Sequence, residues 1–464
     1  MLTKDFLEDT IAAIATPPGR GAIGVIKISG KDSLPILKKI FKPAKPKEKF
    51  ESHKLYYGFI VDPQGKVIDE VLITYMKAPR TYTREDVVEI YAHSGYLILR
   101  KILELILLSG ARQARPGEFT LRAFLNGRID LAQAEAIEEL ISAKSEEALD
   151  LALKNLFGGI SEKINNIKNK ILEVLVQIES AIDFPEEDIE IMEPEKLSKR
   201  IRSEIIPEIE ALIKAYNQGK VYKEGINLVI AGKPNAGKSS LMNALLKEER
   251  AIVTPIPGTT RDFLEEEASI EGIPVKLIDT AGLRETQDPV EKIGVEIAKK
   301  KFKEADLILF LIDISEPENN EVIKLLKEVM GFPHLVVLNK IDIENNYLEE
   351  WRKKIASLKE DWIEISVTKG INLDLLTKKI VEKILGKGKK EVPQLVPTLR
   401  QKVLLEKAKN ALERALKTLS QKEPLPELVA VEIRDALSEL SEIVGEVTSE
   451  DVLSEIFSRF CIGK

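Results

Sequence analysis

The stretch "GKPNAGKS", residues 232–239, has the spacing G-x-x-x-x-G-K-[ST] of a phosphate-binding loop. It follows the apolar run "INLVIA" at 226–231 and precedes "SLMNALL", which has helical character. In this context the glycines let backbone N–H groups surround phosphate oxygens, and the helix N-terminus adds a favourable dipole. We expect Lys238 to reach the β and γ phosphates and the Ser239 hydroxyl to bind Mg²⁺. The alternative, a chance lysine in a glycine-rich turn, is disfavoured by the motifs that follow.

Two of these motifs would complete the phosphate and Mg²⁺ site. In "GTTRD", the Thr260 hydroxyl can bind Mg²⁺ and sense the γ phosphate. In "DTAG", Asp279 ends the apolar run "VKLI", as a Walker B carboxylate does, and Gly282 can donate its N–H to the γ phosphate. The order of the motifs is that of a nucleotide switch protein.

Two later motifs predict selectivity for guanine. "NKID" follows the apolar run "HLVVL", and Asp342 can accept hydrogen bonds from guanine N1–H and N2–H₂, which adenine cannot donate. Asn339 and Lys340 would brace the base. "EIS" resembles the last guanine-contacting loop, with Ser366-Val367 in place of the usual Ser-Ala. The sequence therefore predicts a guanine-nucleotide switch.

One position departs from Ras-like GTPases, in which a glutamine after DTAG orients the attacking water. Leu283 occupies this position and cannot orient water, so catalysis needs a different water-orienting group and a different source of positive charge. Asn235 and the carbonyl groups of "TPIPGTT" (254–260) could hold a monovalent cation in the role of an arginine finger. Glu291 lies within loop reach of the water, although the residues alone favour a solvated carboxylate in the first turn of a helix.

The candidate residues of this nucleotide site come from all of these motifs. The expected catalytic residues from the motifs are Asn235 and Lys238, and only a family resemblance outside these motifs adds Glu291. The expected GTP-binding residues are Asn235, Ala236, Gly237, Lys238, Ser239, Ser240, Thr254, Pro255, Ile256, Pro257, Gly258, Thr259, Thr260, Asp279, Thr280, Ala281, Gly282, Asn339, Lys340, Asp342 and Ser366.

The pattern of strand and helix signals along the chain predicts a multidomain protein with α/β and all-α parts. Residues 1–120 mix strand signals such as "VIDEVLITYM" with one helical run, and residues 121–222 are amphipathic helices. Residues 223–386 alternate short apolar runs with helical segments, as a doubly wound parallel sheet does. Residues 387–464 return to helices. We therefore predict one helical domain with a movable α/β domain inserted into it.

Length and composition limit the class of protein. The 464 residues imply two to four domains, and 44% hydrophobic with 31% charged residues is ordinary globular composition. The single cysteine excludes an intramolecular disulfide and fits a reducing cytosol. No membrane span or signal peptide is expected, so we predict a cytoplasmic protein. The net charge of −7 argues against a general positive field for nucleic acid, but it leaves room for a local basic patch.

Three smaller features need an interpretation. "GRGAIG" (19–24) has the formal dinucleotide-binding spacing, but it precedes a β-rich run, so we interpret its glycines as turn residues. His53, His93 and His334 lack metal-ligand spacing, so ordinary structural or surface roles are expected. The lone Cys461 is either a nucleophile or acid near a substrate, or a small buried apolar side chain.

Three stretches outside the nucleotide motifs carry a family resemblance: "ATPPGRGAIGVIKISG" (15–30), "ARPGEFTLRAFLNGRIDLAQAEAI" (114–137) and "CIGK" (461–464). With them, essentially the whole chain resembles the MnmE (TrmE) family of tRNA-modification GTPases. Era and Der proteins share the nucleotide motifs but not these three stretches. The resemblance implies an N-terminal α/β folate-binding and dimerisation domain, a helical domain and an inserted Ras-like GTPase domain.

The resemblance also implies roles for individual residues. Mg²⁺ would be held by Ser239 and Thr260, and K⁺ by Asn235, Thr254, Ile256 and Thr259. Glu291 falls where the family's water-orienting acid lies. The implied tetrahydrofolate contacts are Lys27, Glu85, Arg128 and Lys464. Lys27 is usually Arg in the family and Arg128 usually Lys, which keeps the charge and changes the geometry.

The implied activity is modification of the wobble uridine of certain tRNAs at C5, giving an aminomethyl-type group. The family members are homodimers that work with the flavoprotein MnmG, which carries the FAD, and a 5-formyl or methylene tetrahydrofolate supplies the one-carbon unit. GTP hydrolysis is implied to need K⁺ and Mg²⁺ and to bring the two GTPase domains of the dimer together.

Two other classes of function stay open at the level of sequence. One is an Era-like regulatory switch that binds RNA or the ribosome and modifies nothing. The other is a mechanical dimer whose GTPase domains open and close helical arms, with the chemistry residing in the flavoprotein. Folate use separates the first alternative from the leading interpretation, because a pure switch does not need a one-carbon donor.

The last residues of the chain are expected to have a fixed position next to the folate site. Leu453, Ile456 and Phe460 share a helical face that can anchor the last helix, which would hold "CIGK" at a fixed point. Gly463 allows a turn, and the Lys464 cation suits the anionic glutamate tail of a folate. We therefore expect the tail to line the folate site.

Overall fold

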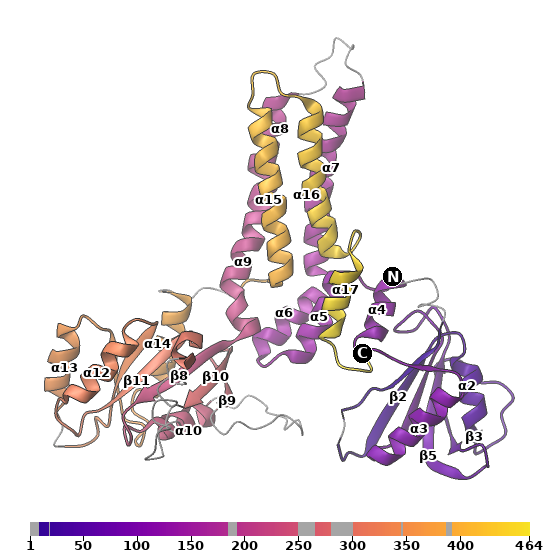
Figure 1. The fold of residues 1–464 in the computed structure, drawn as a ribbon, viewed down its shortest axis with the longest axis horizontal. Coiled ribbons are helices and arrows are strands. Elements are labelled where there is room, and N and C mark those ends of the chain that lie inside the picture. Colours follow the sequence, from indigo (N-terminus) through magenta and orange to yellow (C-terminus); the bar gives the residue numbers. More distant parts are fainter. Residues whose placement is uncertain are drawn as a thin grey trace. The chain divides into compact units, whose positions relative to one another are not determined.

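A computed structural model describes residues 9–17, 19–183, 193–248, 265–279, 300–344, 347–386 and 392–464 (Figure 1). The chain forms two compact units. The first unit comprises Met1–Ile141, Lys154–Ala211 and Leu399–Lys464, and the second comprises Ser142–Leu153 and Leu212–Thr398.

The N-terminal part of the first unit is a seven-stranded sheet. Its strands are β1 (Ile11–Ile14), β2 (Ile23–Ser29), β3 (Phe41–Pro43), β4 (Lys54–Val61), β5 (Val67–Met76), β6 (Val87–His93) and β7 (Arg112–Gln113). Their order is β3-β4-β5-β6-β2-β1-β7, and only the β1–β7 pair is parallel among them. The helices α2 (Ser33–Ile40) and α3 (Tyr96–Leu108) supply apolar side chains to the core on this sheet. The strand predicted at "VIDEVLITYM" is confirmed as β5.

The glycines of "GRGAIG" are only partly turn residues. Gly19 and Gly21 precede β2, as predicted, and a strand rather than a helix follows them. Gly24, however, lies inside β2, so the turn interpretation was wrong for this glycine. A Cβ on Gly24 would lie 2.6 Å from Cδ1 of Leu99, so the packing of α3 against the strand explains the glycine.

The rest of the first unit is helical. Its helices are α4 (Glu118–Leu125), α5 (Leu131–Ser142), α7 (Gly159–Asp183), α8 (Pro194–Arg200), the π-helical turn η1 (Ile201–Ile205), the first residues of α9 (Ile206–Glu224), α15 (Leu399–Leu419), α16 (Pro426–Val444) and α17 (Glu450–Ser458). From Leu212 onward, α9 belongs to the second unit. The helix α16 packs against both α15 and α7 (Figure 1). One face of α15 is apolar, and every member of this face is buried: Leu405, Ala408, Leu412, Ala415 and Leu419.

The second unit contains a six-stranded sheet with helices on both faces. Its strands are β8 (Ile226–Gly232), β9 (Glu265–Ile270), β10 (Ile273–Asp279), β11 (Leu307–Asp313), β12 (His334–Asn339) and β13 (Trp362–Ile365). Its helices include α10 (Lys238–Glu248), α12 (Asn320–Val329), α13 (Leu348–Ser357) and α14 (Leu373–Leu385). The order is β13-β12-β11-β8-β10-β9, with only β9 antiparallel. The predicted doubly wound sheet is confirmed.

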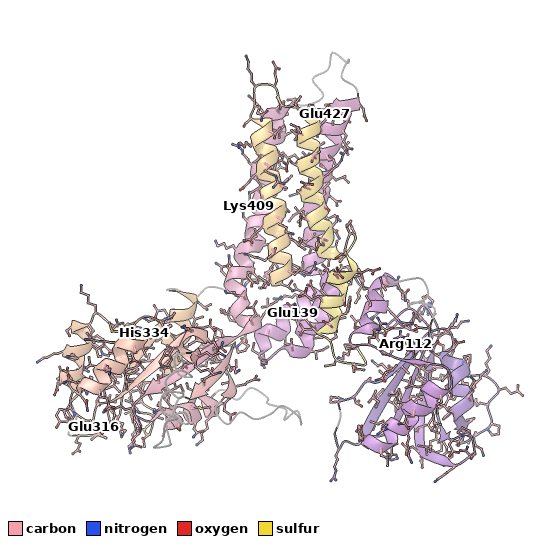
Figure 2. The ribbon with its side chains drawn as sticks, viewed as in Figure 1. Arg112, Glu139, Glu316, His334, Lys409 and Glu427 are labelled. Atoms are coloured by element: carbon pink, nitrogen blue, oxygen red, sulfur yellow. The ribbon has the colours of Figure 1, made fainter. Side chains whose placement is uncertain are left out.

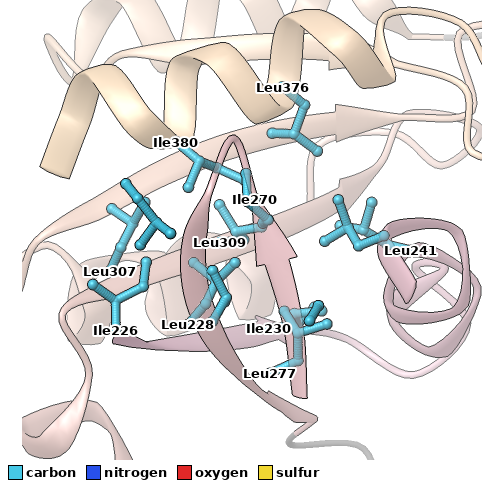
Figure 3. Close-up of a cluster of buried hydrophobic side chains, with 14 of the residues drawn as sticks. Ile226, Leu228, Ile230, Leu241, Ile270, Leu277, Leu307, Leu309, Leu376 and Ile380 are labelled. Carbon is cyan, nitrogen blue, oxygen red and sulfur yellow. The ribbon is translucent and has the colours of Figure 1, made fainter. Parts of the chain in front are cut away.

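Near-continuous apolar strands build two cores, one on each face of this sheet. One core contains Leu241 of α10 with Leu376 and Ile380 of α14 (Figure 3). The other contains side chains of α12 and α13, among them Trp351. Strands buried on both faces need apolar residues at successive positions, which explains runs such as "LILFLID".

A short segment of the helical sequence belongs to the second unit. Residues Ser142–Leu153 include most of α6 (Glu146–Leu156), and Leu151 is buried in the same core as Leu228 and Leu277. Lys144 pairs with Glu267 of β9 at 2.5 Å. The domain boundaries expected at 120, 222 and 386 remain predictions.

Candidate functional site

The phosphate-binding loop joins β8 to α10 and needs glycine at both glycine positions of its motif. Gly232 has φ +144°, and a Cβ there would lie 2.4 Å from the carbonyl oxygen of Leu311. Gly237 has φ +97°, and its Cβ would lie 2.4 Å from Nδ2 of Asn339. Asn235 has φ +63°, and its side chain is exposed at the loop. At Gly232 and Gly237 the backbone therefore lies too close to neighbouring atoms for any residue larger than glycine.

Lys238 is folded into this loop and is only 5% exposed. Its Nζ donates to the carbonyl oxygens of Lys233 at 2.7 Å and Gly232 at 3.1 Å. These contacts hold the ammonium group at the start of α10, where the helix dipole and the loop N–H groups also favour phosphate. Ser239 is exposed in the first turn of α10, where its hydroxyl can serve a Mg²⁺ ion.

Asn339 connects the base-recognition loop to the phosphate-binding loop. This side chain is 2% exposed, and its Nδ2 donates to the carbonyl oxygen of Ala236 at 2.9 Å. Its Oδ1 accepts from the backbone N–H of Val367 at 3.2 Å. Three segments far apart in sequence are thus held together at the carboxyl edge of the parallel strands, where ligands bind in such sheets.

Lys340 is oriented by a residue that the sequence analysis missed. Lys340 has φ +72° and forms an ion pair with Asp313 at the end of β11. Burial alone would raise the pKa of the Asp313 carboxyl. The hydrogen bonds from Lys340 and Ser315 lower this pKa by a larger amount, so it lies below its ordinary value. The position of Asp313 after an apolar strand, like that of Asp279, was the signal that could have revealed it.

The other base-recognition residues lie at the same edge. Asp342 is exposed just beyond β12, and Ser366 is fully buried just beyond β13. The register pairs Asn339 with Ile365, so the two strands end side by side. The Ser366 hydroxyl accepts from the N–H of Lys369 at 3.1 Å, which shapes the loop.

Part of the predicted nucleotide site lies outside the described residues. Asp279 ends β10 in register with Ile230, as predicted for a strand-end acid. The predicted residues outside the described ranges are Thr254, Pro255, Ile256, Pro257, Gly258, Thr259, Thr260, Thr280, Ala281, Gly282 and Glu291. Within the described residues, no group of three His, Cys, Asp or Glu side chains could hold a metal ion.

A buried ionic cluster occupies the first unit and was not predicted. Arg122 of α4 is fully buried, and its guanidinium donates to Asp9, Glu85 and Glu118. Arg112, labelled in Figure 2, donates through Nη2 to Glu118 at 2.6 Å and through Nε to Asp9 at 2.6 Å. The buried charges of Arg122 and Glu118 are thus paired, as buried charges require, while Arg112 and Asp9 are each 35% exposed at the edge of the cluster.

Three of the four predicted folate residues meet beside this cluster. The Arg128 guanidinium lies 4.7 Å from the centroid of the Tyr82 ring, and the Lys27 Nζ lies 6.0 Å from the same centroid. Glu85 accepts from the Ser29 hydroxyl at 2.7 Å. Since Ser29 is two residues beyond Lys27 on β2, the sequence-distant residues face one region.

A pocket of about 460 Å³ opens next to this region. Its lining combines the Tyr82 ring with three guanidinium groups, and the lining residues are Met76, Pro79, Arg80, Thr81, Tyr82, Arg84 and Arg128. Burial raises the pKa of Tyr82, so the ring stays a neutral surface. An aromatic face with several cations suits a flat, anionic ligand.

The C-terminal tail is held against the first strand of the same sheet. Gly463 is buried at φ +96°, and a Cβ there would lie 2.7 Å from the carbonyl oxygen of Ile14. The Cys461 carbonyl oxygen accepts from the N–H of Gly117 at 3.4 Å. The anchoring residues predicted for the last helix, Leu453, Ile456 and Phe460, are all buried.

The two interpretations of Cys461 fare differently. Cys461 is exposed, so its interpretation as a buried apolar side chain was wrong. Lys464 is half-buried beside β1, the strand paired with β2, which carries Lys27. The tail is thus fixed near the predicted folate residues by backbone contacts, which explains the glycine in "CIGK".

The histidines have the ordinary roles expected of them. His334 begins β12 (labelled in Figure 2), with Nδ1 at 2.8 Å from the carbonyl oxygen of Phe332 and Nε2 at 2.8 Å from Glu360. His93 contacts Asp69 at 2.8 Å, and His53 contacts the carbonyl oxygen of Arg80 at 3.0 Å. Over the described ranges, no helix is long and apolar enough to span a bilayer.

A doubly wound sheet with a phosphate-binding loop, a lysine folded into that loop and an Asn-Lys-x-Asp loop bonded to it defines a P-loop GTPase. Comparison with known families then specifies which one. The family model for the GTP-binding protein TrmE N-terminus matches residues 10–128, and the model for the MnmE helical domain matches 131–461.

Full-length relatives agree. A tRNA modification GTPase MnmE of Carboxydothermus hydrogenoformans is 45% identical over 462 residues, covering 99% of this chain and all of the relative. One of Aquifex aeolicus is 46% identical over 459 residues with the same coverage. A structure of an Aquifex aeolicus Era variant with GDP and aluminium fluoride is 31% identical, with TM-score 0.29, over 43% of this chain and 69% of that one. The full-length relatives and the family models show that the chain belongs to the MnmE family.

Proposed function

We propose that this GTPase modifies the wobble uridine of certain tRNAs at C5, together with the flavoprotein MnmG. A tetrahydrofolate supplies the one-carbon unit, the FAD resides on MnmG, and the chain acts as a homodimer in the cytoplasm. The observation that carries the proposal is that Lys27 and Arg128 both lie over the Tyr82 ring in the first unit, while Glu85 is bonded to Ser29 on the strand that carries Lys27. A GTPase switch alone would not need this second cationic and aromatic site.

The residues of the first unit suit a folate in three respects. The Tyr82 ring can stack on the flat pterin, and Arg128 and Lys27 can meet the anionic glutamate. Glu85 is held by Arg122 and Ser29, so its carboxylate is oriented before a ligand arrives. Lys464 lies on the docked tail and can add a further cation.

The decisive experiment is reconstitution with MnmG, tRNA, GTP, K⁺, Mg²⁺ and methylene tetrahydrofolate, followed by mass spectrometry of the tRNA nucleosides. Glu85→Gln should abolish the modified uridine and leave GTP hydrolysis within about twofold, because the GTPase site belongs to the other unit. Glu104→Gln, on the exposed surface of α3, is the matched control. In the same assay, Cys461→Ala should abolish modification if the thiol takes part in the chemistry.

Two outcomes would overturn the proposal. One is a modified nucleoside formed equally well without folate. The other is GTP-dependent RNA binding with no change in any nucleoside, which would favour the regulatory-switch alternative.

We also propose that GTP hydrolysis requires two metal ions, K⁺ and Mg²⁺. The Mg²⁺ ion would be held by Ser239 and Thr260. The exposed Asn235 at the loop apex supports a cation there, together with Thr254, Ile256 and Thr259. Hydrolysis should be at least about tenfold faster in K⁺ than in Na⁺, a part of the ~10³–10⁵ that an arginine finger provides. Glu291→Ala should lower kcat with little change in GTP affinity, because the loss falls on the transition state. Equal rates in the two salts would contradict the cation site.

A further inference from the structure

One strongly charged surface of the first unit is not used by either site. The stretch "KKIFKPAKPKEK", residues 38–49, contains six lysines and a single acidic residue. All six lysine side chains are exposed, and we call this set the lysine edge: Lys38, Lys39, Lys42, Lys45, Lys47 and Lys49. It runs from the end of α2 through β3, the edge strand of the sheet.

The charge of the lysine edge contrasts with the rest of the chain. Residues 1–128 contain 21 basic and 14 acidic residues, a net charge of +7. Since the whole chain carries −7, the remaining residues carry −14. An acidic protein with one basic region directs a polyanion to that region and repels it elsewhere.

The lysines of the edge are available to a ligand. Among the described residues, none of the six forms an ion pair within 4.0 Å, whereas the adjacent Lys54 is paired with Glu51. Lys39 donates to the carbonyl oxygen of Ser109 at 3.0 Å, and Lys47 lies 5.2 Å from the centroid of the Tyr56 ring. These two contacts position side chains without neutralising their charge.

Protection of an exposed sheet edge is the plainest alternative, because lysines on edge strands prevent strand pairing between molecules. That role requires only Lys42, the one lysine within β3. Lys38 and Lys39 precede the strand, and Lys45, Lys47 and Lys49 follow it. Edge protection therefore leaves five of the six charges unexplained.

We propose that the lysine edge binds the sugar–phosphate backbone of the RNA substrate. The inference rests on the proposed function, which makes tRNA that substrate. Lysine ammonium groups repeated every two or three residues match a repeating phosphate chain without reading its sequence. Tyr57 of the neighbouring β4 is 47% exposed, and the N–H of Ala44, between the lysines, donates to the Tyr57 carbonyl oxygen at 3.1 Å. This ring offers a stacking surface for an unpaired base beside the phosphate contacts.

The test measures tRNA affinity of the full-length chain, alone and with MnmG, over a range of KCl concentrations. The variant is Lys42→Gln/Lys45→Gln/Lys47→Gln. The matched control is Lys407→Gln/Lys417→Gln/Lys422→Gln, which removes three exposed lysines of the same unit from α15 and the residues after it. A third variant, Lys42→Arg/Lys45→Arg/Lys47→Arg, keeps the charge.

We expect the glutamine variant to bind tRNA about tenfold more weakly near 0.1 M salt, with a salt slope smaller by about two to three, since each lost phosphate contact removes about one. The control and the arginine variant should bind like the wild type. The urea transition of the first unit, followed by circular dichroism, should be unchanged in all variants, which shows that this unit is folded.

Three results would overturn the inference: unchanged affinity and salt slope in the glutamine variant, an equal loss in the control, or no tRNA binding by the wild-type chain. Normal tRNA binding with loss of MnmG binding would also overturn it, because the edge would then be a protein-docking surface. Failure of the proposed function would give a different result from failure of this inference. In that case tRNA would still bind through the lysine edge, but its nucleosides would stay unmodified.

Discussion

The two sites of this protein are built in opposite ways. In the second unit, the phosphate-binding loop occupies eight consecutive residues, 232–239, between one strand and one helix. In the first unit, the candidate folate residues run from Lys27 to Lys464, and Lys27 and Arg128 approach the same Tyr82 ring only because distant stretches of the chain fold together. A local site is visible as one motif, whereas an assembled site draws its side chains from several stretches that lie far apart in the sequence.

The largest effect that would test this difference comes from Arg122→Leu. The change leaves the Glu85 carboxylate without its guanidinium partner and leaves the buried Glu118 with Arg112 alone, which should cost about 3–5 kcal/mol of unfolding free energy in the first unit. Both tryptophans, Trp351 and Trp362, belong to the second unit, so their fluorescence reports on that unit alone. In urea, circular dichroism should show an earlier transition while the fluorescence midpoint stays unchanged.

Arg100→Leu is the control for this experiment, because Arg100 pairs with Glu104 on the exposed surface of the same unit. It should cost less than about 1 kcal/mol. An equal shift of both transitions in the Arg122 variant would show that the two units unfold together and that the comparison fails.

A smaller effect is expected from Gly463→Ala in the tail. The new Cβ would meet the Ile14 carbonyl oxygen at 2.7 Å, and the left-handed backbone adds about 1–2 kcal/mol of strain. The tail should detach, so carboxypeptidase should release Lys464 several-fold faster, while GTP hydrolysis is unchanged.

Gly65→Ala separates the clash from the strain, since Gly65 has φ +81° and no atom within 4 Å of its Cβ position. The control should lose stability but keep its tail protected from the peptidase. Slow release of Lys464 in the Gly463 variant would mean that the tail is held by other contacts.

The smallest expected effect is the pH-dependent stabilisation of the second unit by the ion pair between Arg352 and Glu364. The side-chain hydrogen bonds of Arg352 lower the pKa of Glu364, and the two groups are joined at 2.6 and 2.7 Å. Because the pKa of Glu364 in the folded protein lies below its ordinary value of 4.5, this stabilisation is present above about pH 4.5 and disappears as pH falls through the folded pKa.

Arg352→Gln should therefore cost at most about 1 kcal/mol at pH 7, given a partly exposed pair, and the difference from wild type should approach zero in acid. Urea titrations followed by tryptophan fluorescence at several pH values measure this difference. A difference that grows in acid would have the wrong sign for this ion pair.

The sequence predicted the second unit well because its structure follows local rules. Buried parallel strands need continuous apolar runs, and the motif residues lie at the strand ends. Asp313 was missed although it obeys the same rule. In the first unit, the helices and the strand at 67–76 were predictable from periodicity, but Tyr82 and Arg122 were not. Their roles depend on Lys27, Glu85 and Asp9, whose proximity is set by the sheet order and not by spacing.

The same long-range assembly limits what can be recognised about single residues. In the sequence, Gly24 is indistinguishable from a turn glycine, yet it is required by Leu99 from a helix some seventy residues later. The exposure of Cys461 likewise follows from how the tail docks. Such facts depend on the packed neighbours, and no spacing rule supplies them.

The division of the helical bundle has a consequence for the order of synthesis. The helix α7 ends at Asp183, and its partner α16 begins at Pro426, 243 residues later (426 − 183). At ribosomal rates of about 5–20 residues per second, the apolar face of α7 waits about 12–50 s for that partner. During this time the second unit can fold on completed sequence. Chains that stop before residue 399 lack α15, α16 and the tail, so they leave this face uncovered and become substrates for chaperones and proteases.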